Sequence, residues 1–138
     1  MIAAAIQFVA AAVLLGIASV KDIKTREIPD WISVFVALTA LINFRLENLL
    51  GIIVAAIFFA VALRTGKIGG GDVKLIAALS VMCGLWSSLA LLFFAQLSML
   101  IYFAIYYFIC KINGKTADKS LPFVPFIFIG YLCSGLIF

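Results

Sequence analysis

Long runs of apolar residues without a charge constrain this chain more than any other feature of its sequence. The first run, residues 2–20, contains no Asp, Glu, Lys or Arg. As a helix rising about 1.5 Å per residue, it is long enough to cross a hydrocarbon core of about 30 Å. Hydrophobic residues make up 67% of the chain, whereas soluble domains contain roughly 45–50%. The sequence therefore predicts an all-α, polytopic membrane protein.

Six apolar segments, divided by short polar stretches, are the expected transmembrane helices. The first is interpreted as a retained helix, because a signal peptide has basic residues before its apolar run and here the charges follow it. A division after Gly84 is expected because residues 73–110 are too many for one span. The six helices form one membrane-embedded domain, residues 1–138. The expected segments are residues 2–20, 29–44, 49–63, 73–86, 88–110 and 121–138.

Positive charges are distributed unevenly between the polar stretches. Nine of the ten Lys and Arg residues lie in or next to the stretches after the first, third and fifth segments, and Arg45 alone follows the second. By the positive-inside rule, these three stretches face the cytoplasm and both termini lie outside. We therefore expect a multi-pass protein of the cytoplasmic (inner) membrane, in contact with lipids. The basic residues form no single patch, which argues against nucleic acid as a partner.

Two aspartates, Asp22 in KDIKTREIP and Asp72 in GGGDVKL, lie in these cytoplasmic stretches. A carboxylate at a membrane boundary is costly unless it is paired, solvated or used in function. In an aspartic protease, one ionised carboxylate activates water while a protonated one donates to the peptide carbonyl. Neighbouring carboxylates suit this chemistry because they share one proton. We expect Asp22 and Asp72 to be the catalytic pair, since Glu47 lies outside and Asp118 in a polar loop.

Small, basic and proline residues next to the aspartates are the candidates for substrate binding. The glycines before Asp72 permit positive φ and close approach of a peptide backbone. Alternatively, they form an inner turn that ends in Asp72 as a helix N-cap. The lysines two residues after each aspartate either lower the pKa values of the pair, contact lipid phosphates, or only set the topology. A proline suits the first turn of a helix. The candidates are Gly69, Gly70, Gly71, Lys24, Lys74 and Pro29.

Histidine and cysteine usage predicts no metal site and no cofactor. The chain has no His, and its three cysteines are scattered through apolar segments without a Cys-x-x-Cys pair. Ligands for a structural metal or partners for a disulfide framework are therefore not expected. We interpret Cys83, Cys110 and Cys133 as small apolar residues of the core or of the lipid-facing surface.

The aspartates belong to a set of motifs that resembles one family of membrane proteases. Asp22 is followed seven residues later by Pro29, and Asp72 closes a Gly-x-Gly-Asp motif. The segment VKLIAAL after Asp72 and the segment LPFVPFIFIG from residue 121 fit as well, although family members often have glycine in place of Val124. Together the motifs resemble the prepilin peptidases, the aspartic membrane proteases that remove leader peptides from type IV pilins and archaellins.

This resemblance implies a substrate, namely a prepilin-like protein whose basic leader precedes a hydrophobic N-terminal helix. The larger, bifunctional members carry a cytoplasmic insert with paired cysteines and N-methylate the mature pilin, and the chain shows no such insert. It is similar to the short forms of tight-adherence pilus and archaeal systems, which implies an aspartic-type endopeptidase without methyltransferase activity. We also expect Pro122 and Pro125 to break the start of the last helix and let backbone groups face the site.

Two other kinds of function are compatible with the sequence. In a small proton- or cation-coupled transporter or channel subunit, the two aspartates would form an ion site. Their position at the cytoplasmic edge argues against this, because transporter sites lie near the bilayer midplane. In a membrane scaffold without chemistry, a glycine loop that ends in an acid at a helix start would have no purpose. The sequence contains no indication of an oligomeric state.

Overall fold

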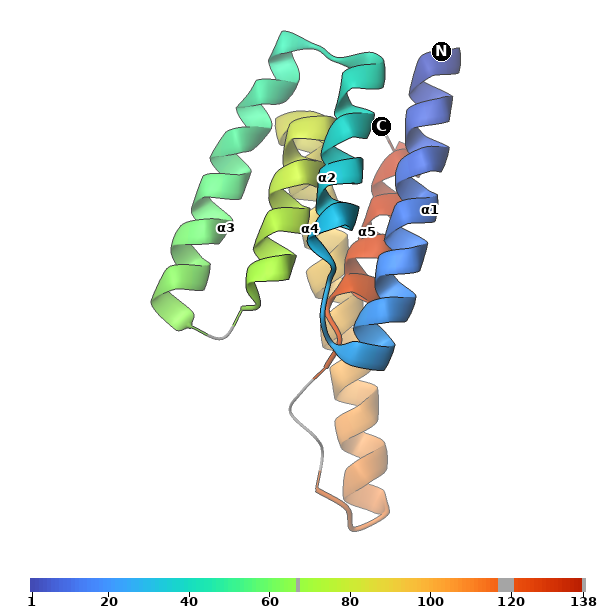
Figure 1. Cartoon of the computed structure of the whole chain (residues 1–138). Coiled ribbons are helices and arrows are strands. Elements are labelled where there is room, and N and C mark those ends of the chain that lie inside the picture. Colours follow the sequence, from blue (N-terminus) through green and yellow to red (C-terminus); the bar gives the residue numbers. More distant parts are fainter. Residues whose placement is uncertain (67, 117–120, 138) are drawn as a thin grey trace.

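The computed structural model describes residues 1–66, 68–116 and 121–137, and every regular element in these ranges is a helix (Figure 1). The expected all-α class is therefore confirmed for the described residues. The first helix extends past the predicted segment 2–20, so that Asp22 lies in its last turns. In chain order the elements are α1 (Ile2–Thr25), α2 (Asp30–Thr39), η1 (Ala40–Asn43), η2 (Leu46–Leu50), α3 (Gly51–Thr65), α4 (Gly70–Ile112) and α5 (Val124–Ile137), where η marks a short 3-10 helix.

Several of these helices are long and apolar enough to cross a membrane. The three long ones are α1, the continuous stretch Leu46–Thr65 and α4. The remaining two, Asp30–Asn43 and Val124–Ile137, are apolar but shorter. The pattern fits a membrane protein, and the number of six spans stays a prediction.

The long helix α4 is interrupted at Gly84, whose backbone has φ 80° and ψ −178°. Only glycine adopts this conformation readily. Figure 1 shows that the chain turns back at this point, so that the two halves of α4 run in opposite directions. The freed carbonyl of Met82 accepts a hydrogen bond of 3.0 Å from Nδ2 of Asn48, and that of Gly84 accepts one from the hydroxyl of Ser88. The division expected after Gly84 thus lies at Gly84 itself.

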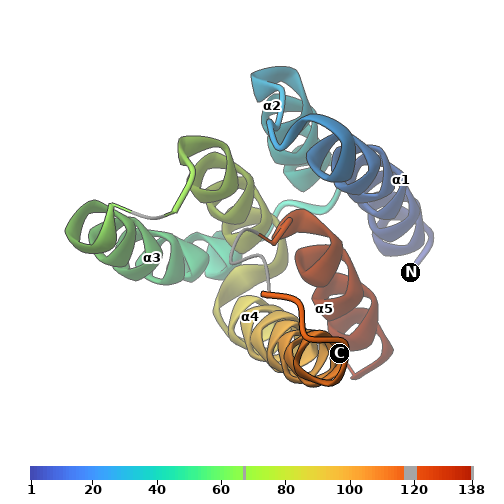
Figure 2. The same cartoon turned by 90° about the horizontal axis from the view of Figure 1, so that it is seen from below.

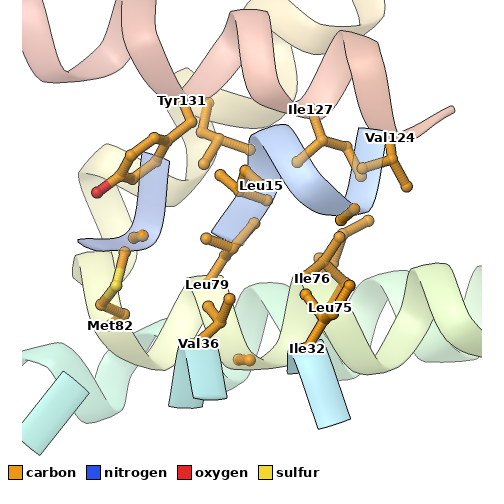
Figure 3. Packing of buried hydrophobic residues seen from close by; sticks show 14 of the residues in the cluster. Leu15, Ile32, Val36, Leu75, Ile76, Leu79, Met82, Val124, Ile127 and Tyr131 are labelled. Atoms are coloured by element: carbon orange, nitrogen blue, oxygen red, sulfur yellow. The ribbon is translucent and has the colours of Figure 1, made fainter. Parts of the chain in front are cut away.

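The core lies between α1, α2, α5 and the first half of α4 (Figure 3). It contains Leu15 of α1, Ile32 and Val36 of α2, and Ile127 of α5, all fully buried. Figure 3 shows the side chains of Leu75, Ile76 and Leu79 from α4 reaching into the same cluster.

Glycines bring other helices of the bundle into close contact. A Cβ atom at Gly51 would collide with the carbonyl of Ser80, and one at Gly130 with the carbonyl of Leu91. These glycines let α3 approach the first half of α4 and α5 approach the second half, as small residues do between membrane helices.

The directions of the helices determine which ends meet. The start of α1 and the end of α5 lie at one end of the bundle, whereas the end of α1 and the starts of α4 and α5 lie at the other (Figure 1). Seen from below in Figure 2, α1 occupies an edge of the bundle beside α2 and α5. The last turn of α1 and the first turns of α4 and α5 therefore lie at the same end of the bundle.

Candidate active site

Asp22 lies near the end of α1, and both its side chain and its backbone carbonyl accept hydrogen bonds. The residue is buried, with 6% of its surface exposed, and Oδ2 accepts a hydrogen bond of 3.0 Å from the backbone N–H of Val124. Its own carbonyl accepts the N–H of Arg26 at 2.9 Å, where the helix ends. Arg26 has φ 55° and is the non-glycine residue with positive φ among the described residues. The carboxylate is thus directed into the bundle and given a defined donor.

The donor from Val124 is available because α5 begins at this residue. The first N–H groups of a helix have no partner within the helix, and the partial positive charge of the helix N-terminus favours a carboxylate there. Pro125 lacks an N–H, and Phe123 accepts the N–H groups of Phe126 and Ile127 at 3.1 and 3.2 Å. The N–H of Val124, between Pro122 and Pro125, is a backbone group of this segment that faces Asp22, as expected, and the contribution of the prolines stays a prediction.

Asp72 lies opposite, in the first turn of α4 and ahead of the apolar segment 73–86. Burial, and after it the charge of Asp22, raises the pKa of Asp72 to about 6. The two aspartates line one cavity of about 320 Å³. The other residues that line it are Arg26, Glu27, Ile28, Asp30, Gly69, Gly70 and Gly71. The cavity therefore combines one hydrogen-bonded carboxylate with one carboxyl group that holds its proton more strongly than usual.

The three glycines reach the cavity, but their backbone differs from the prediction. Gly69 is the N-cap of α4 with φ −64°, and Gly70 and Gly71 are helical, so the expected positive φ is wrong. The alternative of Asp72 as N-cap is also wrong, because Asp72 lies inside the helix. Close approach does occur at Gly71, where a Cβ atom would lie 3.1 Å from Cβ of Ile28. Gly71 thus permits tight packing at the start of α4.

The remaining candidates lie around the cavity and not in it. Lys74 forms an ion pair with Asp30, with 2.8 Å between Nζ and Oδ1, which ties the start of α4 to the start of α2. Lys24 is exposed and, with Pro29, lines a second hollow beside α1. Pro29 is the N-cap of α2 with φ −63°, one position ahead of the first turn in which it was expected.

Comparison with known proteins identifies the family. The sequence profile of the type IV leader peptidase family matches residues 9–105, which include both aspartates. The chain belongs to this family. It is 32% identical over 133 residues to the prepilin leader peptidase/N-methyltransferase of Bacillus subtilis (strain 168), across 89% of this chain and 52% of that protein. The chain thus spans about half the length of this relative. No solved structure matches it significantly.

Four residues that line the aspartate cavity of this member of the leader peptidase family were not predicted from the sequence. Arg26, Glu27, Ile28 and Asp30 line the cavity, and they belong to the connection between α1 and α2 and to the first residue of α2. Their closeness to Asp22 in the sequence could have indicated that they lie near the site. In the described part of the chain, no three His, Cys, Asp or Glu side chains are grouped so that they could hold a metal ion.

Proposed function

We propose that this chain is a membrane-embedded aspartic endopeptidase that removes basic leader peptides from type IV prepilin-like precursors. The observation that carries the proposal is the single cavity lined by Asp22 and Asp72, which come from separate helices 50 positions apart. Membership of the type IV leader peptidase family supports a peptide as the substrate. The precursor carries its basic leader ahead of an apolar helix, and the bond between the two parts is cut.

The surroundings of the two carboxyl groups support different roles for them. Asp22 accepts a hydrogen bond from the N–H of Val124 at the positive end of α5, which gives it a fixed donor. Asp72 keeps its proton up to about pH 6, because burial and the charge of Asp22 raise its pKa. Asp22 is therefore assigned as the general base and Asp72 as the general acid.

Two proton transfers accompany each half of the reaction. Asp22 takes a proton from a water molecule, whose oxygen bonds to the scissile carbonyl carbon, while Asp72 donates its proton to the carbonyl oxygen. In the second half, the C–N bond of the tetrahedral intermediate breaks. Asp22 then gives its proton to the departing nitrogen, and Asp72 recovers a proton from the intermediate's hydroxyl group. The products are a carboxylic acid and an amine, and both aspartates return to their starting forms.

The proposed enzyme crosses the cytoplasmic membrane six times, with its active site on the cytoplasmic side and both termini outside. The turn at Gly84 supports six helical segments, because it divides α4 into two antiparallel halves. The concentration of basic residues next to the ends that carry Asp22 and Asp72 supports the orientation.

Only the peptidase activity is proposed, because the paired cysteines of the bifunctional members have no counterpart among Cys83, Cys110 and Cys133. An ion-transport function is less well supported. Both aspartates lie at helix ends on one side of the bundle, whereas transporter sites lie near the bilayer midplane.

Cleavage of a precursor by the purified chain in detergent tests the proposal. A prepilin-like substrate with a basic leader should become shorter, as seen by electrophoresis and mass spectrometry. Asp22→Asn and Asp72→Asn should each abolish the cleavage and leave the thermal unfolding temperature near that of the parent chain. Glu47→Gln, an exposed acid in η2 at the other end of the bundle, is the matched control and should stay active. Substantial cleavage by either Asn variant would show that the acid pair is not the catalyst.

A further inference from the structure

A hollow of about 870 Å³ lies along the outer side of α1, next to the aspartate cavity. In both Figure 1 and Figure 2, α1 lies at the edge of the bundle, and no helix of the described chain covers this side. Its apolar floor consists of Val13, Gly16, Ile17 and Val20. Because these residues follow the spacing i, i+3, i+4 and i+7, they share one face of α1 over about two turns.

Gly16 is not needed for the packing of the chain itself. A Cβ atom at Gly16 would meet no heavy atom within 4 Å, in contrast to one at Gly130, which would collide with the backbone of α4. A glycine inside a helix costs about 0.5–1 kcal/mol relative to alanine, and no contact within the described chain accounts for that cost here. Small residues on a membrane helix allow a second helix to approach closely. The missing side chain thus fits an apolar helix supplied by another molecule.

The hollow borders the aspartate cavity. Glu27 and Ile28, in the connection between α1 and α2, line both spaces. A helix that lies along α1 would therefore end beside the aspartate cavity, with Glu27 and Ile28 at the boundary. The hollow also carries Lys21 and Lys24, just beyond the apolar segment 2–20. Like charges repel, so these lysines disfavour a basic leader in the hollow and leave the apolar part of the precursor to occupy it.

We propose that the hollow beside α1 binds the apolar helix of the precursor, the part that directly follows the bond to be cut. This inference rests on the proposed function and adds the place where the substrate docks. The substrate helix lies against Val13, Gly16 and Ile17 within the bilayer, and its first residues extend past Ile28 into the aspartate cavity. The position of the hollow beside the aspartate cavity favours a substrate as its occupant over a lipid chain or a second copy of this chain.

Filling the hollow tests this docking. Gly16→Leu places a side chain in open space and raises helix propensity, so the folded chain should keep its stability. We expect KM for the full precursor to rise about tenfold, which corresponds to about 1.4 kcal/mol of lost binding, with kcat unchanged. A short peptide that spans the cut but lacks the apolar helix should be cleaved as by the parent chain. Ala60→Leu, at an exposed position of α3 outside the hollow, is the control for added bulk.

The two substrates separate failure of the docking proposal from failure of the proposed function. An unchanged KM for the full precursor in Gly16→Leu, or an equal rise for both substrates, would overturn the docking proposal. Failure of the parent chain to cut either substrate would count against the protease itself.

Crosslinking identifies the occupant directly. A photoreactive residue at Ile17 in the Asp72→Asn chain should crosslink to the apolar helix of an uncut precursor, whereas one at Phe59, on the exposed face of α3, should not. Crosslinks from position 17 to a second copy of the chain, or to lipid alone, would contradict the proposal.

Discussion

The hydrogen bond between Val124 and Asp22 can be removed by one substitution that preserves the start of α5. Proline lacks the N–H and is tolerated at the first position of a helix, which is where Val124 lies. Val124→Pro should therefore remove the donor to Oδ2 of Asp22 without unwinding the helix, and because the ring Cδ takes the place of the amide hydrogen, Oδ2 must also move away. Val124→Ala is the matched control, because it shortens the same fully buried side chain and keeps the N–H.

The size of the effect follows from the burial of the acceptor. A hydrogen bond to a charged group contributes about 1.5–3 kcal/mol. Without it, Asp22, of which 6% is exposed, is buried more deeply than Asp72, and the shared proton moves toward Asp22. At about 1.4 kcal/mol per factor of ten, the lost bond changes the ratio of the two placements of the shared proton by about ten- to a hundredfold. We expect kcat to fall by up to this factor, with KM nearly unchanged because the N–H does not touch the substrate.

Kinetics over a range of pH distinguish this effect from simple damage. In Val124→Pro, kcat should be lower than in Val124→Ala at every pH tested, because only the control keeps the N–H that donates to Asp22. The alanine control should keep the parent profile, and both variants should unfold at similar temperatures. If Val124→Pro cleaves the precursor as fast as Val124→Ala with the same profile, the N–H does not support Asp22. The assignment of base and acid would then have to be abandoned.

Two further outcomes follow from the site. Because the pKa of Asp72 is raised to about 6, the proton needed by the acid is present below this pH and lost above it. Cleavage measured as kcat/KM should therefore fall by about tenfold per pH unit above pH 6, and a flat profile to pH 8 would contradict the role of Asp72. Gly71→Val would press against Ile28 and should lower stability by about 1–3 kcal/mol in thermal or denaturant unfolding. Gly70→Ala, which faces open space, should not, and equal stability of the two variants would refute the packing argument.

That the two aspartates line one cavity was predictable from the sequence, because it depends on where the two residues lie relative to the ends of the apolar segments. Asp22 and Asp72 follow and precede apolar segments that end on the same face, so a bundle with alternating helix directions brings them together. The interruption of α4 was predictable for a similar reason, since the apolar stretch is too long for one span and contains Gly84 near its middle.

The finer geometry of the site depends on interactions that residue types do not reveal. The donor to Asp22 is a backbone group, and its residue, Val124, is apolar, so only the prolines around it pointed to a break there. The partner of Lys74 is Asp30, which the spacing of the motifs did not suggest. The glycines before Asp72 permit positive φ, but their backbone does not use it, and close packing against Ile28 accounts for Gly71.

The position of the site at helix ends follows from the cost of a charge in an apolar bundle. Within a helix, backbone donors are already used, so a buried carboxylate in mid-bundle would have no backbone N–H to accept. At the ends, the unpaired N–H groups of α5 supply a donor to Asp22, and Asp72 lies in the first turn of α4. The cavity of the two aspartates is also lined by residues of the connection between α1 and α2. The amides of an intact substrate helix are hydrogen-bonded within that helix, and we infer that the precursor must unwind at the cut before Asp22 and Asp72 can reach it.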